Sequence, residues 1–600
     1  MTTTGPDRHA DGVRTLPDAL RLRNQKQPDE NAYIFLRDGE EPGATLTYRE
    51  LDRDARARAA GLTAAGLPGG IAVLLYPSGL EFVRTLLGCM IARVTPAPLQ
   101  VPRRREGLRR LRRIADDAGT STLLTTSEVR AELLARFGEL PELAGLTLIA
   151  TDDPRFARDP GEGAELPPEP GPDDIALLQY TSGSTGTPKG VRVTHANFLA
   201  NVSETDELWP CEPSGTVVNW LPLFHDMGML FGVVLPLWAG IPSYLMTPDA
   251  FIRRPARWLE AIARFGGTHA AAPSFAYELC ARAAASGAAG AVGDLSRWRV
   301  AANGAEPVRW QTVEAFTTAF APHGFRPAAM CPGYGLAENT LKATGDRQDR
   351  EPTVLWLSAQ ALREGTVEIT HGTDGDAVPL VSSGGTVSGT RIRIVDPATR
   401  IPCPPDRVGE IWISGPCVAN GYLGRDEESE EVFRARTAYQ DADAPLSHLR
   451  TGDLGFLHEE ALYITGRLKD VIIRQGRNHY PQDIELSVER AVPGLHPNCA
   501  AAFSTDDGTR ERLVLLIEAD GRVLRTPGAD GVRERVREAV YADHRLTPDD
   551  IMVVRRGTLS KTSSGKVQRR ACRARYENGE LTASAVGTAA VSASGPERGV

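Results

Sequence analysis

The stretch Asp174-Ile-Ala-Leu-Leu-Gln-Tyr180, followed at once by Thr181-Ser-Gly-Ser-Thr-Gly-Thr-Pro-Lys-Gly190, decides the fold class. Its first part is a short apolar run, which predicts a buried strand. Its second part holds three glycines, five hydroxyl residues and Lys189 within ten residues. Glycines let a backbone approach a phosphate chain closely, and hydroxyls and amides donate hydrogen bonds to it. The stretch therefore predicts a strand that leads into a phosphate-binding loop.

This loop differs from the Walker A loop of other nucleotide-binding proteins. Pro188 precedes the lysine, and Gly190 follows it where a Walker A loop requires Ser or Thr. A plain surface loop is the alternative, but such a loop has no reason to concentrate these residues directly after a buried strand.

Strand and helix patterns alternate on both sides of the loop. Residues 71–76 predict a buried strand, and residues 81–92, just after it, predict a helix. Such alternation favours an α/β fold with ligands bound at the carboxyl ends of strands. A chain of 600 residues is too long for one ordinary core, so two or more domains are expected.

Composition excludes several classes of protein. The formal net charge of -9 argues against a nucleic-acid binder, which would normally show a basic surface. The first residues lack the apolar segment of a secretory signal. The eight cysteines form no CxxC pair and fit no zinc pattern, which predicts a reduced, cytoplasmic protein.

The uncharged stretch 227–248 is long enough to cross a membrane. Pro236, Gly240 and Pro242 interrupt it, so a buried helix followed by a buried strand is the better interpretation. We therefore expect no stable membrane insertion.

Five further motifs follow the loop in sequence. They are Phe224-His-Asp-Met-Gly228, Gly333-Tyr-Gly-Leu-Ala-Glu-Asn-Thr340, Arg450-Thr-Gly-Asp-Leu-Gly455, Gly466-Arg-Leu-Lys-Asp-Val-Ile-Ile473 and Lys561-Thr-Ser-Ser-Gly-Lys566. In this order, the six motifs resemble those of the adenylate-forming superfamily, over about residues 15–576. The stretches 219–228, 272–280, 298–308 and 477–485 resemble its fatty acyl-AMP ligase branch. The segment at about 342–378 resembles the insertion that marks this branch and is thought to disfavour transfer to coenzyme A.

The resemblance implies a domain organisation. We expect a large α/β adenylation domain of several subdomains at 16–466, a hinge at 467–469 and a small, mobile α+β domain at 470–576. Composition predicts disorder for residues 1–15 and 577–600.

The resemblance also implies roles for single residues. Lys566 would bridge the substrate carboxylate and the α-phosphate of ATP, and His225 would lie at the carboxylate end of the pocket. Asp453 would accept the ribose hydroxyls, and Glu338, a hard oxygen ligand, would bind Mg²⁺. The residues expected to bind the nucleotide are Thr181, Ser182, Gly183, Ser184, Thr185, Gly186, Lys189, Gly304, Ala305, Glu306, Tyr334, Gly335, Glu338, Asp453 and Arg467.

The expected reaction joins a fatty or related carboxylic acid to ATP, giving acyl-AMP and pyrophosphate. The acyl group then passes to the phosphopantetheine thiol of an acyl carrier protein. Three alternatives stay open: an acyl-CoA synthetase, a catalytically silent binder, and an amino-acid adenylation domain that would use Asp226 to bind the substrate ammonium.

Seven arginines between Arg103 and Arg113 form a basic run. A solvated surface helix is the simpler interpretation, and a docking patch for an acidic partner protein is the functional one.

Overall fold

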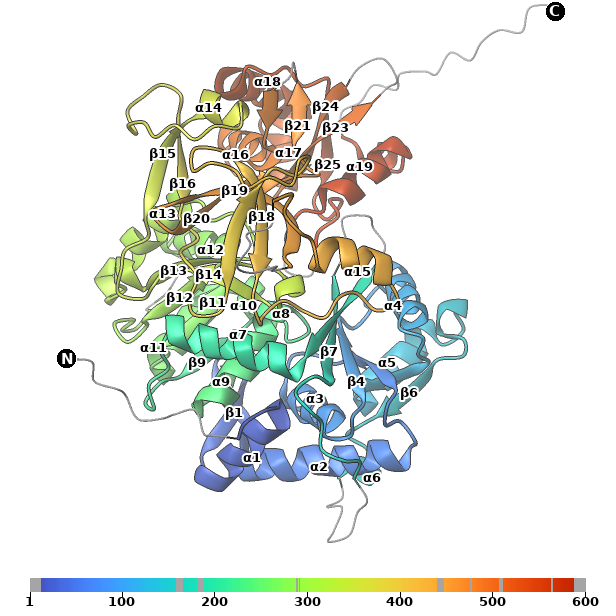
Figure 1. The fold of residues 1–600 in the computed structure, drawn as a ribbon. Helices are drawn as coiled ribbons and strands as arrows, with labels where there is room; N and C mark the ends of the chain where they lie inside the picture. Colours follow the sequence, from blue (N-terminus) through green and yellow to red (C-terminus); the bar gives the residue numbers. More distant parts are fainter. Residues whose placement is uncertain are drawn as a thin grey trace, which may run out of the picture. The chain divides into compact units, whose positions relative to one another are not determined.

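The computed structural model describes residues 12–157, 166–181, 188–287, 290, 292–439, 447–474, 477–506, 511–562 and 565–586 (Figure 1). Described residues up to Thr465 form one compact unit, and those from Gly466 onward form a second. Among the described residues, no helix is long and apolar enough to cross a membrane.

The first unit is built around a mixed sheet of eight described strands. Its inner strands run parallel, and the two edge strands β2 and β14 run antiparallel to their neighbours. The carboxyl ends of the parallel strands therefore share one edge, where α/β proteins bind ligands. In spatial order, the strands are β14 (Lys342–Gly345), β13 (Met330–Gly335), β12 (Val300–Asn303), β11 (His269–Ala272), β9 (Val217–Asn219), β10 (Ser243–Leu245), β1 (Asn31–Arg37) and β2 (Glu41–Thr47).

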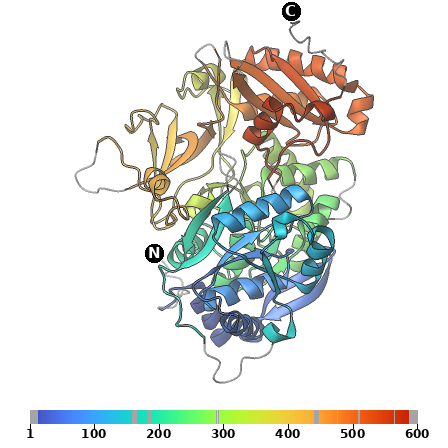
Figure 2. The same cartoon turned by 90° about the vertical axis from the view of Figure 1, so that its right-hand side faces the viewer.

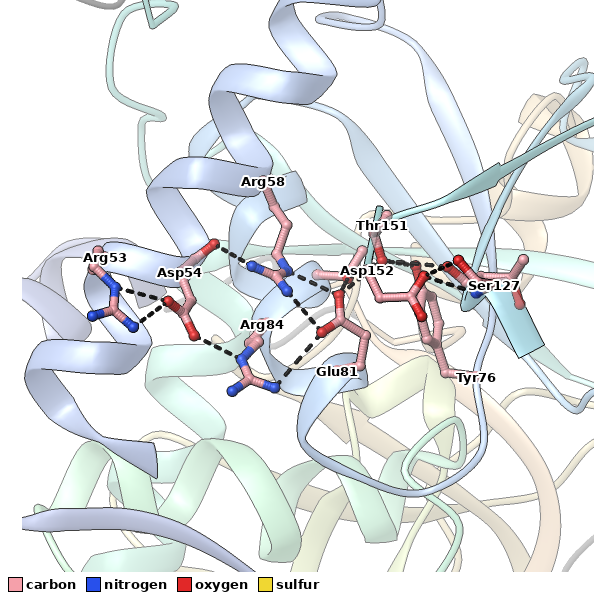
Figure 3. A network of polar contacts seen from close by, with 11 residues as sticks. Arg53, Asp54, Arg58, Tyr76, Glu81, Arg84, Ser127, Thr151 and Asp152 are labelled. Atoms are coloured by element: carbon pink, nitrogen blue, oxygen red, sulfur yellow. Dashed lines mark hydrogen bonds and ion pairs between the residues drawn. The ribbon is translucent and has the colours of Figure 1, made fainter. Parts of the chain in front are cut away.

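A second sheet of this unit is parallel throughout. Its spatial order is β4 (Thr95–Leu99), β3 (Ile71–Leu75), β5 (Thr122–Thr125) and β6 (Thr147–Ala150). Figure 3 shows the polar network beside it, where Arg58 pairs with Glu81 at 2.8 Å and Thr151 donates to Glu81 at 2.9 Å. The Tyr76 hydroxyl lies 2.8 Å from that of Thr151. Because these groups satisfy one another, the network holds helices α2 (Tyr48–Ala64) and α3 (Leu80–Ile91) against the sheet.

Three smaller sheets complete the strands described in this unit. They are β17 (Arg391–Val395), β18 (Gly409–Ser414), β19 (Leu449–His458) and β20 (Ala461–Arg467), the pair β15 (Val354–Ser358) and β16 (Ala377–Val381), and the pair β7 (Ile175–Thr181) and β8 (Lys189–Thr194). The predicted strand before the phosphate loop is confirmed as β7. It pairs antiparallel with β8, so the loop joins two strands of a hairpin.

Helices pack on these sheets around aromatic residues. Trp258, Trp298, Tyr277 and Phe316 are fully buried and meet edge to face at 5.0–6.1 Å, an arrangement that aromatic quadrupoles favour. The main helices are α1 (Leu16–Lys26), α2 (Tyr48–Ala64), α3 (Leu80–Ile91), α4 (Arg105–Asp117), α5 (Ser127–Phe137), α7 (His195–Leu208), α10 (Pro248–Arg253), α11 (Ala256–Phe265), α12 (Ser274–Ala285), α13 (Trp310–Phe320), α14 (Ala359–Arg363) and α15 (Asp426–Phe433).

The uncharged stretch 227–248 folds as predicted, into buried helical turns followed by a buried strand. The turns are α8 (Asp226–Met229), a π-helical turn at Leu230–Val234 and α9 (Leu235–Ala239), and β10 follows. Gly240 ends the helical part with a left-handed φ of 71°. The prediction of strand 71–76 and of helix 81–92 is likewise confirmed by β3 and α3.

The second unit is a three-stranded sheet with helices on both faces (Figure 2). Alternation along the strands sends Leu513 and Leu515 to the face covered by α16 and α18, and Val514 and Leu516 to the face covered by α19. Its elements are β21 (Ile472–Arg474), β22 (Arg477–His479), α16 (Pro481–Ala491), β23 (Ala500–Asp506), β24 (Glu511–Ala519), α17 (Gly521–Arg525), α18 (Gly528–His544), β25 (Asp550–Arg555) and α19 (Arg569–Glu577).

Three predicted boundaries differ from the structure. Thr15, expected in a disordered end, caps α1 through a capping box with Asp18. Residues 577–586, expected in a disordered tail, are ordered because Leu581 is buried and the Val586 amide donates to the Val553 carbonyl at 2.9 Å. Residues 342–345, expected in the insertion, form the buried edge strand β14. Residues 1–11 and 587–600 lie outside the described part of the chain.

Candidate active site

The stem of the predicted phosphate loop is a hairpin in which Thr181 pairs with Lys189 and Tyr180 with Gly190. A Cβ at Gly190 would lie 3.0 Å from the Tyr180 ring, so close packing favours glycine there. Thr194 ends the hairpin by capping α7, with Asn197 completing the capping box. The predicted loop residues Ser182, Gly183, Ser184, Thr185 and Gly186 lie outside the described residues.

Contacts from two distant segments hold this stem. The Tyr180 hydroxyl donates to Asp117 at 2.9 Å, and Arg425 donates both to Asp117 at 2.7 Å and to the Pro188 carbonyl at 3.3 Å. Burial, with a contribution from Asp117, raises the pKa of Tyr180, so its hydroxyl stays protonated and remains a donor. Arg425 immediately precedes α15. The start of this helix is therefore tied to the phosphate-loop stem.

Lys189 lies at the centre of a small polar cluster. Its ammonium pairs with Glu428 of α15 and lies 5.1 Å from the centre of the Tyr422 ring. The Tyr422 hydroxyl donates to Glu338 at 2.9 Å. The structure thus connects two residues that the sequence assigned to phosphate and Mg²⁺, Lys189 and Glu338, through a tyrosine that sequence reasoning missed.

The segment that follows β13 carries three of the predicted residues. Tyr334 and Gly335 end the strand, and Glu338 lies in a 3₁₀ turn at Ala337–Asn339. Thr340 closes the turn at a φ of 64°, a strained value for a β-branched residue, and its hydroxyl donates to the Cys417 carbonyl at 2.8 Å. This strained residue directly follows the turn that contains Glu338.

Asp453 is held by the same segment. Its Oδ2 accepts a 2.7 Å hydrogen bond from the Tyr334 hydroxyl, and its amide donates to the Thr451 hydroxyl at 3.0 Å. Glu410, only 2% exposed, fixes the turn before it by accepting from Arg450 at 2.8 Å and from the Gly452 amide at 3.1 Å. The buried carboxylate of Glu410 thus positions the half-buried carboxylate of Asp453.

Gly304, Ala305 and Glu306 follow β12, whose last residue Asn303 pairs with Pro332 of β13. A Cβ at Gly304 would lie 2.8 Å from the Gly333 carbonyl, so glycine lets the two loops approach each other. The Glu306 carboxylate accepts from the Phe275 amide at 2.5 Å, at the start of α12. These predicted residues therefore lie at the shared carboxyl edge of the parallel strands.

His225 follows β9 at the same edge and caps α8. Its Nδ1 lies 2.6 Å from Oδ1 of Asp226, which also accepts from the Met227 amide at 2.7 Å. Gln179 of β7 donates to the Phe224 carbonyl at 3.1 Å, which ties this turn to the hairpin. Asp226 is engaged locally, which disfavours its use as the ammonium ligand of an amino-acid adenylation domain.

The second unit carries Arg467, Lys469 and Lys566. Arg467 ends β20, and its carbonyl accepts from the Asp470 amide at 3.0 Å, while Lys469 is exposed. Arg569 joins Asp470 at 3.3 Å and Glu485 at 2.7 Å, which anchors the residue after the predicted hinge.

Two hydrogen bonds join Lys566 to Thr562 in that unit. The Thr562 amide donates to the Lys566 carbonyl at 2.8 Å, and the Lys566 amide donates to the Thr562 hydroxyl at 3.1 Å. Lys561, the other lysine of the motif, pairs with Glu518 at 2.6 Å. In this motif, the Lys561 side chain pairs with a carboxylate, whereas the Lys566 backbone bonds to Thr562.

The basic run 103–113 is largely paired. Arg103 pairs with Asp249 at 2.8 Å, Arg105 with Glu142 at 2.9 Å and Arg112 with Asp116 at 2.9 Å. These contacts support the simpler interpretation of a solvated surface helix.

Sequence reasoning missed Asp117, Glu410, Tyr422, Arg425 and Glu428. Their signal in the sequence is weak, because Glu428 stands in the acidic run 426–431, which is typical of a solvated helix. Only the pairing of distant segments reveals these residues.

Comparison with known proteins identifies the family of this chain. The family model "AMP-binding enzyme" matches residues 20–423, and "Disco-interacting protein 2-like, AMP domain" matches residues 469–586. The chain is 41% identical to the medium-chain-fatty-acid–[acyl-carrier-protein] ligase JamA of Moorena producens, over 94% of this chain and 96% of that protein. It is 35% identical to the long-chain-fatty-acid–AMP ligase FadD26 of Mycobacterium tuberculosis, over 94% and 97%.

A solved structure supports the same assignment. The fatty acyl-adenylate ligase from Legionella pneumophila, in complex with acyl adenylate and pyrophosphate, aligns with a TM-score of 0.74 at 34% identity, over 96% of this chain and 98% of that one. The protein therefore belongs to the AMP-binding enzyme family, in its fatty acyl-AMP ligase branch.

Proposed function

We propose that this ligase activates a fatty acid with Mg·ATP and passes the acyl group to the phosphopantetheine thiol of an acyl carrier protein. One observation carries the proposal. The segment from Tyr334 to Glu338 contacts Asp453 through its first residue and Tyr422 through its last, with Lys189 beside Tyr422. Groups suited to ribose, metal and phosphate are thus linked through this one segment.

The adenylation step needs charge and position more than proton transfer. A carboxylic acid has a pKa of about 4, so it is ionised at neutral pH and needs no general base. Its oxygen attacks the α-phosphorus, an acyl–phosphate bond forms, and the bond to the β-phosphate oxygen breaks to release pyrophosphate. Lys189 and Lys566 would offset the repulsion between two anions, and His225 would orient the acid.

Asp453 and its neighbours suit the nucleoside. Both oxygens of an ionised carboxylate accept hydrogen bonds, and Oδ2 of Asp453 already accepts one from the Tyr334 hydroxyl. Tyr334 thereby fixes the orientation in which Asp453 would meet the ribose hydroxyls. Gly304, Ala305 and Gly335 would lie along the adenine, and Arg467 would contact the nucleotide.

The donor set around Glu338 fits Mg²⁺. The ion is commonly held by one or two protein carboxylates together with water and substrate phosphates. Glu338 is half-buried, and Tyr422 fixes one of its oxygens. The described residues contain no group of three or more His, Cys, Asp or Glu placed to hold a metal. When bound, Mg²⁺ would neutralise charge on the phosphates.

The second step would transfer the acyl group. The thiolate sulfur attacks the acyl carbon, a thioester forms, and AMP leaves. JamA, named as an acyl-carrier-protein ligase, supports a carrier protein as the acceptor.

A product assay tests the first step. Purified protein receives Mg·ATP and saturated fatty acids of increasing length, while acyl-AMP is measured by mass spectrometry and pyrophosphate by a coupled assay. We expect both products in equal amounts with at least one acid. ADP formation, or the absence of acyl-AMP with every acid, would overturn the proposal.

A further inference from the structure

The ion pair between Lys189 and Glu428 occupies the lysine expected to bind phosphate. Lys189 is only 9% exposed and stands at the first position of β8. The Glu428 side chain is 36% exposed, so solvent reaches the carboxylate more readily than the ammonium. A largely buried cation needs a counter-ion, and Glu428 supplies one.

The backbone around Glu428 is fixed independently of this pair. Residues 420–423 run along β8, where the Arg192 amide donates to Gly421 at 2.9 Å and the Leu423 amide donates to Gly190 at 2.8 Å. The first turn of α15 is then secured by Ser429, whose hydroxyl donates to the Arg425 carbonyl at 2.6 Å and accepts from the Tyr422 amide at 2.9 Å. Folding of α15 therefore does not depend on the Glu428 charge.

A carboxylate in this place conflicts with the proposed ligand. Several negative charges of a triphosphate would have to approach Lys189, and like charges at short range repel. Glu428 and the phosphates are all anions, and each can form an ion pair with the Lys189 ammonium. The lysine must therefore exchange one anion for the other when the nucleotide binds.

We propose that Glu428 is the internal counter-ion of Lys189 and competes with the phosphate chain of ATP for it. This inference rests on the proposed function and adds a positioning residue to that site. Glu428 holds the lysine over Tyr422 until phosphate displaces it, and it reclaims the lysine when pyrophosphate leaves. The pair lowers affinity for ATP and speeds release of pyrophosphate.

A matched pair of variants tests this competition. Glu428→Gln removes the carboxylate charge and keeps the shape, and Glu427→Gln removes the same charge from the neighbouring exposed position of α15. Dissociation constants are measured by calorimetry for α,β-methylene-ATP and for AMP, with Mg²⁺. We expect Glu428→Gln to bind the triphosphate analogue about two- to fivefold more tightly, the range for a partly exposed ion pair. Affinity for AMP should stay unchanged, and Glu427→Gln should behave as wild type.

Four further measurements complete the test. Glu428→Asp, which keeps the charge, should restore wild-type affinity for the triphosphate analogue. In a Lys189→Met background, Glu428→Gln should have no further effect, because the two residues act as a pair. Pyrophosphate should inhibit Glu428→Gln more strongly than wild type. Without ligand, Glu428→Gln should unfold at a lower temperature than wild type, because the buried Lys189 then lacks its counter-ion.

Weaker or unchanged binding of the analogue by Glu428→Gln would overturn the competition. An equal change for AMP would also overturn it, since a distorted site would then be the cause. Failure of the wild type to bind the analogue would instead contradict the proposed function.

Discussion

The Tyr334 hydroxyl donates a 2.7 Å hydrogen bond to Oδ2 of Asp453. Tyr334 lies in β13 of the eight-stranded sheet, and Asp453 lies in β19 of a separate sheet. The bond therefore joins two layers of the first unit at the place where the ribose is expected. Its loss should affect nucleotide binding before it affects the fold.

Removing either partner of this bond gives the first prediction. Tyr334→Phe should raise the KM for ATP about three- to tenfold, because one net hydrogen bond is worth about 1 kcal/mol. Asp453→Asn should raise it further, because a bond to a charged acceptor is worth about 1.5–3 kcal/mol. The KM for the fatty acid should not change. A fall in kcat with unchanged KM for ATP would contradict the assignment.

Sequence patterns predicted much of the fold, but they predicted few of the residues that hold the site residues in place. The motifs with phosphate-loop and ribose chemistry are local, so they could be identified without coordinates. Glu410 accepts a hydrogen bond from the Gly452 amide, and Arg425 donates one to the Pro188 carbonyl. The partners in each pair are far apart in the sequence. No local pattern marks such pairs. The antiparallel pairing of β7 with β8 was also missed, because an apolar run does not reveal its partner.

The ordered C-terminal residues also show why composition alone could not predict the structure. Residues 577–586 have the small and polar composition of a tail, yet burial of Leu581 and a backbone bond to β25 hold them. Composition records what a segment contains and not the surface that it meets.

Glu338 gives a prediction on metal dependence. Glu338→Gln keeps the hydrogen bond from Tyr422 but loses the charge, so the Mg²⁺ concentration for half-maximal adenylation should rise at least about tenfold. Tyr422→Phe keeps the carboxylate and should cause a smaller rise. Titration of pyrophosphate release against Mg²⁺ measures both. An unchanged Mg²⁺ requirement in Glu338→Gln would place the ion elsewhere.

The two lysines of the C-terminal motif should behave differently. Lys566→Met should lower the rate of pyrophosphate release about 10²- to 10³-fold, the cost of losing one group that stabilises developing charge. Lys561→Met should instead lower the melting temperature, because it leaves the buried Glu518 without its 2.6 Å partner. Comparison of single-turnover adenylation with thermal unfolding separates them. Equal rates for Lys566→Met and wild type would refute its catalytic role.

Asp346 predicts a pH effect on stability. Burial raises its pKa to about 7, above the value of about 3.9 in an unfolded chain. The folded state therefore binds the proton more tightly. Its contribution to stability is fully present below about pH 4 and is lost as the pH rises through 7.

Asp346→Asn should remove that loss, since an amide stays neutral. We expect the melting temperature of wild type to fall more between pH 5 and pH 8 than that of Asp346→Asn. The buried His195 and His269, whose pKa values burial lowers to about 4, contribute equally to both proteins and cancel in the difference. Parallel curves would show that Asp346 is ionised throughout.

The fate of the acyl-AMP tests the central claim most directly. The enzyme is loaded with its preferred fatty acid and Mg·ATP, then divided between coenzyme A and a pantetheinylated acyl carrier protein, and thioester and remaining acyl-AMP are measured over time. The account predicts that acyl-AMP persists with coenzyme A and is consumed with the carrier protein, giving acyl carrier and AMP. Rapid formation of acyl-CoA would contradict it and make the protein an acyl-CoA synthetase.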